Sequence, residues 1–323
     1  MTAKYRKGFV QRDSVEREEY AKVPSASPGE GKERDGAENL LERILDRNNL
    51  NRAYKQVKGN HGAPGIDGMT VEQALPWLQE HRAELLQSIR EGKYTPSPVR
   101  RKEIPKPDGG VRKLGIPTVV DRIIQQAIAQ QIQPIYEPLF SDASYGYRPR
   151  RSGQQAVRQV KKYAEQGYTY AVEVDLSKYF DTLNHELLME LLRKQIHDKR
   201  VTGLIKRYLK AGVMENGVIT RTREGSPQGG PLSPLLANIY LNEFDQEMTR
   251  RGVKVVRYAD DIVVVTKSKR AAEHMLESCR KFLEGRLKLT MNLQKSKVVS
   301  LFSNRNFKFL GCCLGKDGRG VYI

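Results

Sequence analysis

The stretch Val255-Val256-Arg257-Tyr258-Ala259-Asp260-Asp261-Ile262-Val263-Val264-Val265 is the segment around which the fold is organised. Two adjacent carboxylates stand between two runs of β-branched residues, and the stretch contains no glycine or proline. Because β-branched residues favour strands and aspartate favours turns, the stretch predicts a hairpin with carboxylates at its tip. A hairpin whose aspartates are merely solvated would have the same sequence, so the rest of the chain must decide between these interpretations.

Strand and helix patterns alternate around this hairpin. Residues 168–175 alternate apolar and polar side chains, which predicts a strand that ends on Asp175. Asn184 is placed to cap a leucine-rich helix that follows this strand. Further elements are predicted as helices at 235–241 and 269–287 and strands at 297–302 and 307–313. This order indicates an α+β fold with helices on one face of an antiparallel sheet.

Asp175 and the hairpin tip can lie side by side in such a sheet. Asp175, Asp260 and Asp261 would then crowd three negative charges into one site, which is unfavourable without cations. Carboxylate oxygens suit a pair of Mg²⁺ ions roughly 3.5–4 Å apart, which activate a hydroxyl nucleophile and stabilise a leaving oxygen in phosphoryl transfer. The sequence therefore suggests a two-metal site.

The N-terminal half is predicted to be helical around one basic hairpin. Residues 100–117 place Lys106 and Arg112 on the two arms of a Pro-Asp-Gly-Gly turn. Such a hairpin is either simply solvated or a clamp for a triphosphate. The glycine-rich loop at 59–68 lacks the Gly-Lys-Ser/Thr ending of a nucleotide-binding P-loop, so a turn is expected there. Helices are predicted at 40–57, at 70–89 with a break near Pro76, at 118–133 and from 152 onward.

The composition points to a polyanionic partner. The 323 residues include 56 Lys and Arg against 38 Asp and Glu, a formal net charge of +18. Such an excess favours nucleic acid first and an anionic membrane second. No apolar stretch approaches the roughly 18 residues that a membrane helix needs. The 3 cysteines and 5 histidines show no zinc spacing, so we expect a reducing, cytoplasmic compartment and an oxygen-ligated metal.

Residues 1–38 differ in composition from the rest of the chain. Prolines, serines and glycines stand among equal numbers of basic and acidic side chains, which predicts a mobile tail or one ordered by a partner. The net positive charge therefore belongs to residues 39–323.

A basic body, a hard-metal site and a candidate triphosphate clamp together indicate nucleotide addition, because a nuclease would have no use for the clamp.

From about Leu40 to the end, the motifs resemble those of group II intron-encoded reverse transcriptases, also called maturases. Residues 258–261 resemble the catalytic box of that family, and residues 174–181 resemble its first metal-binding motif. The segment 225–241 is the most group II-like signal, and retron, retroviral and diversity-generating enzymes resemble it less. The remaining similarities are the fingers hairpin at 104–117, a further fingers motif at 140–148 and a primer-gripping strand at 307–311.

The resemblance implies roles for individual residues. Asp175 and Asp260 would ligate two Mg²⁺ ions with the carbonyl of Leu176, and Asp261 would supply nearby negative charge. Lys106 and Arg112 would hold the triphosphate of the incoming nucleotide, and Lys295 would lie near its phosphates. Phe180 would close against a 2′-hydroxyl and so select deoxynucleotides, and Gln228 would line the nucleotide pocket. These roles describe an RNA-directed DNA polymerase.

The resemblance also implies domains and partners. Residues 39–147 would form fingers with an N-terminal RNA-binding extension, and 148–323 a palm whose segment 186–226 partly returns to the fingers, with no thumb. Expected partners are a group II intron RNA, whose splicing and mobility the protein would aid, an RNA template with a DNA primer, and dNTPs. A homodimer and association with a bacterial nucleoid are further expectations. The alternatives are a non-catalytic splicing cofactor that binds intron RNA and a reverse transcriptase of another bacterial retroelement.

Overall fold

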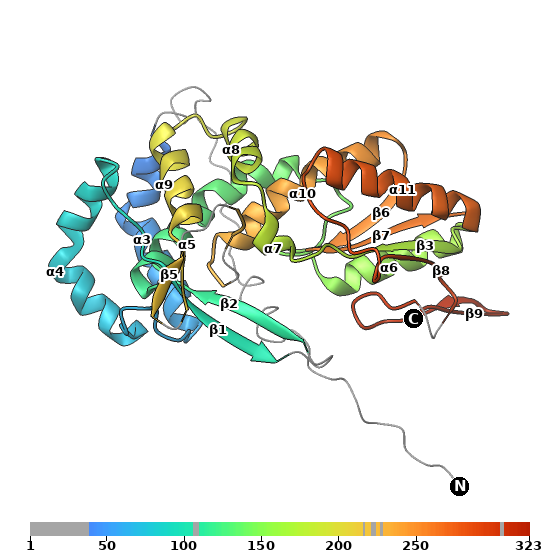
Figure 1. Ribbon diagram of the computed structural model, residues 1–323, viewed down its shortest axis with the longest axis horizontal. Coiled ribbons are helices and arrows are strands. Elements are labelled where there is room, and N and C mark those ends of the chain that lie inside the picture. The colour runs from blue at the N-terminus through green and yellow to red at the C-terminus, as the bar shows by residue number, and fades with distance from the viewer. Residues whose placement is uncertain (1–38, 106–109, 216, 221–223, 227–228, 304–306) are drawn as a thin grey trace, which may run out of the picture.

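The computed structural model describes residues 39–105, 110–215, 217–220, 224–226, 229–303 and 307–323. These residues are arranged as two regions along the longest axis of the molecule (Figure 1). We call the described residues of 40–139 and 185–220 the helical region, and those of 140–182 and 233–323 the sheet region. The predictions for residues 1–38 lie outside the described residues. No helix in the described ranges is both long and apolar enough to cross a membrane.

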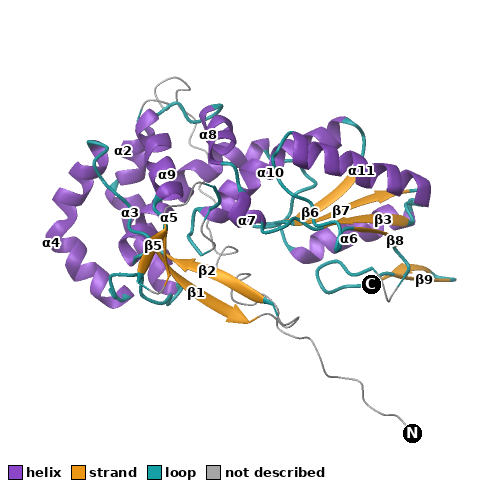
Figure 2. Cartoon of the chain, in the orientation of Figure 1, coloured by secondary structure: helices purple, strands orange, loops and turns teal. Residues whose placement is uncertain are grey.

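Helices dominate the helical region (Figure 2). They are α2 (Leu40–Leu45), α3 (Arg47–Gly59), α4 (Val71–Arg90), α5 (Val119–Tyr136), the 3-10 helix η1 (Glu137–Leu139), α8 (His185–Arg193) and α9 (Lys199–Lys210). α5 is buried on nearly every side, so it forms the centre of this region. As predicted, Thr118 caps α5, and its hydroxyl accepts a hydrogen bond from the Asp121 amide at 3.2 Å.

Helix boundaries differ from the prediction in three places. The helix expected over 40–57 is interrupted at Asp46, whose carboxylate accepts hydrogen bonds from the Asn48 and Asn49 amides and thereby starts α3. α4 shows no break at Pro76, and α5 continues past Pro134. A proline inside a helix removes one backbone hydrogen bond, and the buried faces of both helices offset that loss.

The basic hairpin forms as predicted. β1 (Val99–Pro105) and β2 (Val111–Ile116) pair antiparallel from Arg100 opposite Ile116 to Pro105 opposite Val111. β1 also pairs in parallel with β4 (Val213–Glu215), and β4 pairs with β5 (Val218–Thr220). The order of this sheet is β2-β1-β4-β5, which leaves β2 at an edge. Residues 106–109, including Lys106, lie outside the described residues.

A second four-stranded sheet, ordered β6-β7-β3-β8, forms the sheet region. Its strands are β3 (Tyr170–Val174), β6 (Lys254–Tyr258), β7 (Asp261–Thr266) and β8 (Lys297–Ser300), and all neighbours are antiparallel. The helices of this region are α6 (Gly153–Glu165), α7 (Tyr179–Thr182), α10 (Ser233–Arg250) and α11 (Lys269–Gly285). The α+β fold with an antiparallel sheet is therefore confirmed.

Helices cover both faces of this sheet, whereas we expected them on one. Val172 and Val264 face the core shared with α10 and α11, and that core continues into the helical region. Their strand neighbours Ala171 and Val263 face a second, smaller core with α6 (Figure 1). The unbroken apolar run of β7 is buried on both sides, and a strand covered on both faces has this kind of pattern.

The strand predicted at 307–313 does not form. Leu310 and Gly311 both have left-handed backbone angles, with φ of +51° and +81°, and they reverse the chain within a turn that pairs Phe309 with Cys312. The only regular structure after this turn is a hairpin of β9 (Gly315–Asp317) and β10 (Gly320–Tyr322). Phe307 and Phe309 nevertheless pack into the second core, so their apolar character reflects burial rather than strand formation.

Candidate active site

The central hairpin has its carboxylates at the tip, as predicted. β6 and β7 pair up to Tyr258 opposite Asp261, so Ala259 and Asp260 are the two residues of the turn. Ala259 takes a left-handed conformation with φ of +57°, which a tight two-residue hairpin requires. Asp260 is half-buried, whereas Asp261, the first residue of β7, is exposed.

Asp175 follows directly after β3, beside the hairpin. β3 pairs with β7 so that Val174 lies opposite Ile262. Because the strands are antiparallel, Asp175 and Asp261 follow as the next pair of opposite residues. The backbone at Asp175 is held by the Asn292 amide, which donates to its carbonyl at 2.9 Å, and by a 3.0 Å bond from its own amide to the Ser296 hydroxyl. The next residue, Leu176, forms an isolated antiparallel bridge with Met291 in the segment before β8. The fold therefore brings the three predicted carboxylates to one end of the sheet.

The electrostatics of Asp260 link both regions of the molecule. Burial raises the pKa of its carboxyl above the ordinary value, and the neighbouring Asp175 charge adds to that rise. The hydrogen bond from its own backbone and the positive charge of Arg112 lower this pKa. The charge of Arg257 on β6 lowers this pKa as well, so cations of both regions, Arg112 on β2 and Arg257, favour the charged form of Asp260.

The donor chemistry at this end of the sheet fits magnesium. In the described part of the chain, no group of three or more His, Cys, Asp or Glu residues is arranged to hold a metal ion. Magnesium, however, usually binds through one or two carboxylates and completes its shell with water and substrate phosphates. Asp175 and Asp260 supply hard oxygen donors of that kind, and a cation would neutralise the charge of the half-buried Asp260. The residues therefore suit a metal that binds together with its substrate.

Phe180 lies in the short helix α7 that follows Asp175. It is only 8% exposed, and its ring packs edge-on against Tyr179 with ring centres 5.3 Å apart. The Phe180 carbonyl accepts a hydrogen bond from the Ser226 amide at 2.6 Å, which joins α7 to the start of the 225–234 loop. Gly225 packs so closely there that a Cβ would lie 2.7 Å from the Asp181 carbonyl oxygen. Gln228, predicted to line the nucleotide pocket from this loop, lies outside the described residues.

Lys295 is exposed in the loop that precedes β8. The same loop holds the backbone of Asp175 through Asn292 and Ser296, so Lys295 belongs to a segment that contacts the end of β3. Its predicted role stays a prediction.

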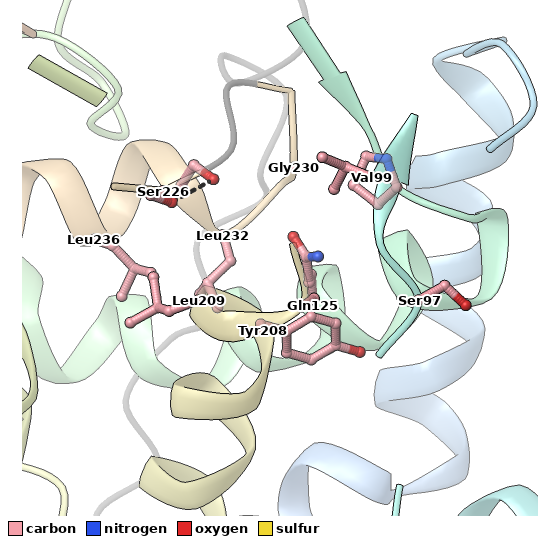
Figure 3. A pocket seen from close by; sticks show the side chains of 12 residues that line it. Ser97, Val99, Gln125, Tyr208, Leu209, Ser226, Gly230, Leu232 and Leu236 are labelled. Carbon is pink, nitrogen blue, oxygen red and sulfur yellow. Dashed lines mark hydrogen bonds between the residues drawn. The ribbon is translucent and has the colours of Figure 1, made fainter. Parts of the chain in front are cut away.

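A small pocket lies where the two regions meet, and Ser226, Gly230 and Leu232 contribute to its lining (Figure 3). Val99 of β1, Tyr208 of α9 and Leu236 of α10 contribute to its walls. The Ser226 hydroxyl donates to the Ser233 hydroxyl at 2.9 Å, and Gln125 lies against Gly230, where a Cβ would be 2.4 Å from its side-chain oxygen. These contacts hold Ser226 against the start of α10 and Gly230 against α5.

Three buried polar residues around the site were not assigned a role from the sequence. Asp121 accepts hydrogen bonds from the Tyr94 hydroxyl, the Ser97 amide and the Thr118 hydroxyl, which ties together the base of the β1–β2 hairpin. His185 donates from Nε2 to the Gly225 carbonyl at 2.6 Å, and burial lowers its pKa. Arg257 lies inside β6 with no exposed surface. Only Arg257 left a signal in the sequence, as a charged residue within an apolar strand.

Comparisons with known proteins identify the family of this chain. The family described as reverse transcriptase (RNA-dependent DNA polymerase) matches residues 104–314. Protein YkfC of Escherichia coli (strain K12) is 40% identical over 296 residues, which cover 79% of this chain and 76% of that protein. The group II intron-encoded protein LtrA of Lactococcus lactis subsp. cremoris is 32% identical over 324 residues, which cover 80% of this chain but 53% of LtrA.

A solved structure supports the fold alone. The telomerase of Candida tropicalis, in complex with a fragment of telomeric RNA, superposes with a TM-score of 0.51 at 13% identity. The match covers 76% of this chain and 48% of the telomerase chain. The family match spans more than half of the sequence and contains Asp175, Asp260 and Asp261. The chain therefore belongs to the reverse transcriptase (RNA-dependent DNA polymerase) family, and its relatives include group II intron-encoded proteins.

Proposed function

We propose that this chain adds deoxynucleotides to a DNA primer on an RNA template by two-metal nucleotidyl transfer. The observation that carries the proposal is the convergence of Asp175, at the end of β3, with the Ala259–Asp260 turn. Asp175 and Asp260 would hold the metal ions with the Leu176 carbonyl, and Asp261 would add negative charge beside them. Magnesium bound there would stabilise the attacking and leaving oxygens of the transfer.

The helical region would supply the cations for the incoming nucleotide. Arg112 already acts electrostatically on Asp260, so a triphosphate bound between them would place its phosphates next to the carboxylates. Lys106, which follows β1 in the sequence, is proposed as its partner on sequence grounds. Phe180, Gln228 and Lys295 complete the proposed pocket, with Phe180 positioned by the hydrogen bond between its carbonyl and Ser226.

The proposed nucleic-acid partner is RNA, in particular a group II intron. The net charge of +18 favours a polyanion, and LtrA is named as a group II intron-encoded protein. A second candidate function is a splicing cofactor without polymerase activity. A relative named nuclear intron maturase 1, mitochondrial, of Arabidopsis thaliana, 27% identical over 44% of this chain, supports a role with intron RNA. We favour catalysis because all three carboxylates are present and the fold brings them together.

Addition of a single nucleotide tests the polymerase proposal. The purified chain is incubated with a DNA primer on an RNA template, one complementary dNTP, and either Mg²⁺ or EDTA. We expect extension by one nucleotide that requires Mg²⁺. A protein that binds the RNA duplex but adds no nucleotide would contradict catalysis and favour the splicing-cofactor alternative.

RNA affinity as a function of salt tests the second part of the proposal. If several phosphates contact the basic body, the logarithm of the binding constant falls linearly with the logarithm of salt concentration, with a slope of about −0.7 to −0.9 per contact. A flat plot would mean that the positive charge serves only solubility. Comparison of intron RNA with a random RNA of equal length shows whether the binding is specific.

A further inference from the structure

Arg257 is a charged side chain buried completely inside an apolar strand. Its side chain and that of Asp245 on α10 are both 0% exposed, and they form an ion pair with a closest distance of 2.6 Å. Burial of an ion pair has a large solvation cost, and apolar residues of similar volume often give equal or better stability. Stability alone is therefore a weak explanation for a charge at this position.

Every donor of the Arg257 guanidinium has a partner. Nε donates to both Asp245 oxygens at 2.9 and 3.0 Å, and one terminal nitrogen donates to the Ser144 hydroxyl and to Asp245. The other terminal nitrogen donates to the Asn238 side-chain oxygen at 2.9 Å and to the carbonyl of Ala259 at 2.8 Å. The planar, five-donor fork of arginine thus joins β6 to three other segments: α10, the segment of Ser144 and the turn at Ala259.

The bond to Ala259 reaches the turn that carries Asp260. Ala259 has a φ of +57°, a conformation that residues with a Cβ rarely adopt without support from their surroundings. Its carbonyl belongs to the peptide that leads directly into Asp260. A displaced Ala259 carbonyl would therefore rotate the backbone from which the Asp260 carboxylate extends.

A second contact holds the same turn from another side. Gly146 lies so close that a Cβ there would be 2.2 Å from the Ala259 nitrogen. The segment containing Gly146 is fixed to the same network: the Asn238 side chain donates to the Gly146 carbonyl at 2.8 Å. Backbone hydrogen bonds from Arg257 to Ala143 and from Tyr145 to Arg257 complete the attachment. The turn is thus enclosed between Arg257 and Gly146.

We propose that Arg257 is a positioning residue for Asp260, which it holds through the Ala259 carbonyl in the orientation needed to bind metal. The proposal rests on the proposed function, in which Asp260 is a metal ligand. Asp245 and Asn238 orient the guanidinium from α10, and Gly146 leaves room for the turn. Arg257 itself contacts no substrate.

Binding of Mn²⁺, followed by electron paramagnetic resonance as a stand-in for Mg²⁺, tests this proposal on the chain bound to primer and template. Arg257→Lys keeps the charge but cannot reach all four partners. We expect the Mn²⁺ affinity to fall about tenfold to a hundredfold, the range typical of residues that orient metal ligands. The rate of single-nucleotide addition should fall roughly a hundredfold, as for a reacting group misplaced by about 1 Å, with the dNTP KM little changed.

Two further variants separate positioning from simple destabilisation. Gly146→Ala displaces the same turn without touching the ion pair, so it should weaken Mn²⁺ binding in the same direction. Asn49→Ala removes a different buried polar side chain, in the helical region. The Asn49 side-chain amide donates hydrogen bonds to the Ile44 and Ala127 carbonyls. This control should lower the melting temperature and leave Mn²⁺ affinity unchanged, all variants being measured at a temperature where circular dichroism shows them folded.

Asp260→Asn distinguishes failure of the positioning role of Arg257 from failure of the proposed function. If Asp260→Asn loses Mn²⁺ binding while Arg257→Lys and Gly146→Ala retain it fully, the positioning role is wrong and the proposed function stands. If Asp260→Asn itself retains Mn²⁺ binding, the proposed function fails and the positioning role fails with it. Weakened binding in all three variants, with Asn49→Ala unaffected, supports both.

Discussion

The two hairpins that carry candidate site residues are built differently. β6 and β7 lie in a four-stranded sheet, and β7 is buried along its length after Asp261. β1 and β2 are exposed over most of their residues near the turn, and β2 is an edge strand. One hairpin therefore presents carboxylates from a fixed core, and the other presents cations from a surface arm.

The supports of the two hairpins differ in the same way. Arg257 contacts the turn of β6–β7 itself, next to Asp260. Asp121 holds the β1–β2 hairpin only at its base, through Ser97 and Thr118. A site supported at the functional residue keeps its geometry, whereas an arm supported at its base can adapt to a ligand. We infer that the sheet region sets the rate of chemistry and the hairpin of the helical region sets nucleotide affinity.

Asp175→Asn should have the largest effect, because it removes a charge from the rigid side. Loss of one metal ligand costs several kcal/mol of transition-state stabilisation, so single-nucleotide addition should fall by at least about a thousandfold. The matched control is Glu173→Gln, two positions earlier on β3, where the carboxylate pairs with Lys297 at 3.2 Å. Equal losses in both variants would show that general disruption of β3, rather than the carboxylate, is responsible.

Arg112→Ala should come next and should act on the other kinetic constant. Loss of a charge-assisted hydrogen bond of about 1.5–3 kcal/mol should raise the dNTP KM about tenfold to a hundredfold, with a smaller effect on kcat. The matched control is Lys113→Ala, at the next position on β2. Lys113 pairs with Glu103 and Glu215, each at 3.5 Å, so its loss should leave the dNTP KM unchanged. If Arg112→Ala lowered kcat and left the dNTP KM unchanged, the inference that the β1–β2 hairpin sets nucleotide affinity would be wrong.

Phe180→Val should change selectivity rather than rate. A smaller side chain would admit a 2′-hydroxyl, so the preference for dNTP over rNTP should fall roughly tenfold, measured as the ratio of the two kcat/KM values. Tyr179→Phe removes only the 2.7 Å hydrogen bond to the Ala237 carbonyl and should leave that preference intact. An unchanged ratio in Phe180→Val would exclude Phe180 as the gate.

Lys295→Ala should have the smallest effect. An exposed lysine contributes at most about 1 kcal/mol in water, so kcat/KM should change by less than about fivefold. A loss as large as that of Arg112→Ala would mean that Lys295 contacts the triphosphate directly. The cation set would then extend from the helical region into the sheet region.

Local patterns made most of the fold predictable from the sequence. The alternation at 168–175 and the β-branched runs around Asp260 gave the correct strands, and Thr118 and Ser152 gave the correct helix starts. The strand expected at 307–313 was wrong because Phe307 and Phe309 are apolar for burial, which periodicity alone does not separate from pairing.

The site was predictable only in part. Carboxylates and cations can be recognised as candidates in a sequence, but the residues that hold them depend on contacts between distant segments. Arg257 meets Ser144 and Asn238 only in the folded chain, and Asp121 joins Tyr94 to the start of α5. Such long-range hydrogen bonds leave no local spacing, so the structure was needed to find them.

Single-nucleotide extension by Asp260→Asn tests the central claim most directly. The variant is compared with the unmodified chain and with Asp317→Asn, an exposed aspartate on β9 outside the site. With Mg²⁺, an RNA template, a DNA primer and one dNTP, we expect extension by the unmodified chain and by Asp317→Asn, and none by Asp260→Asn, with RNA affinity equal in all three. Extension that survives in Asp260→Asn would contradict the assignment of this hairpin as the metal-binding half of the active site.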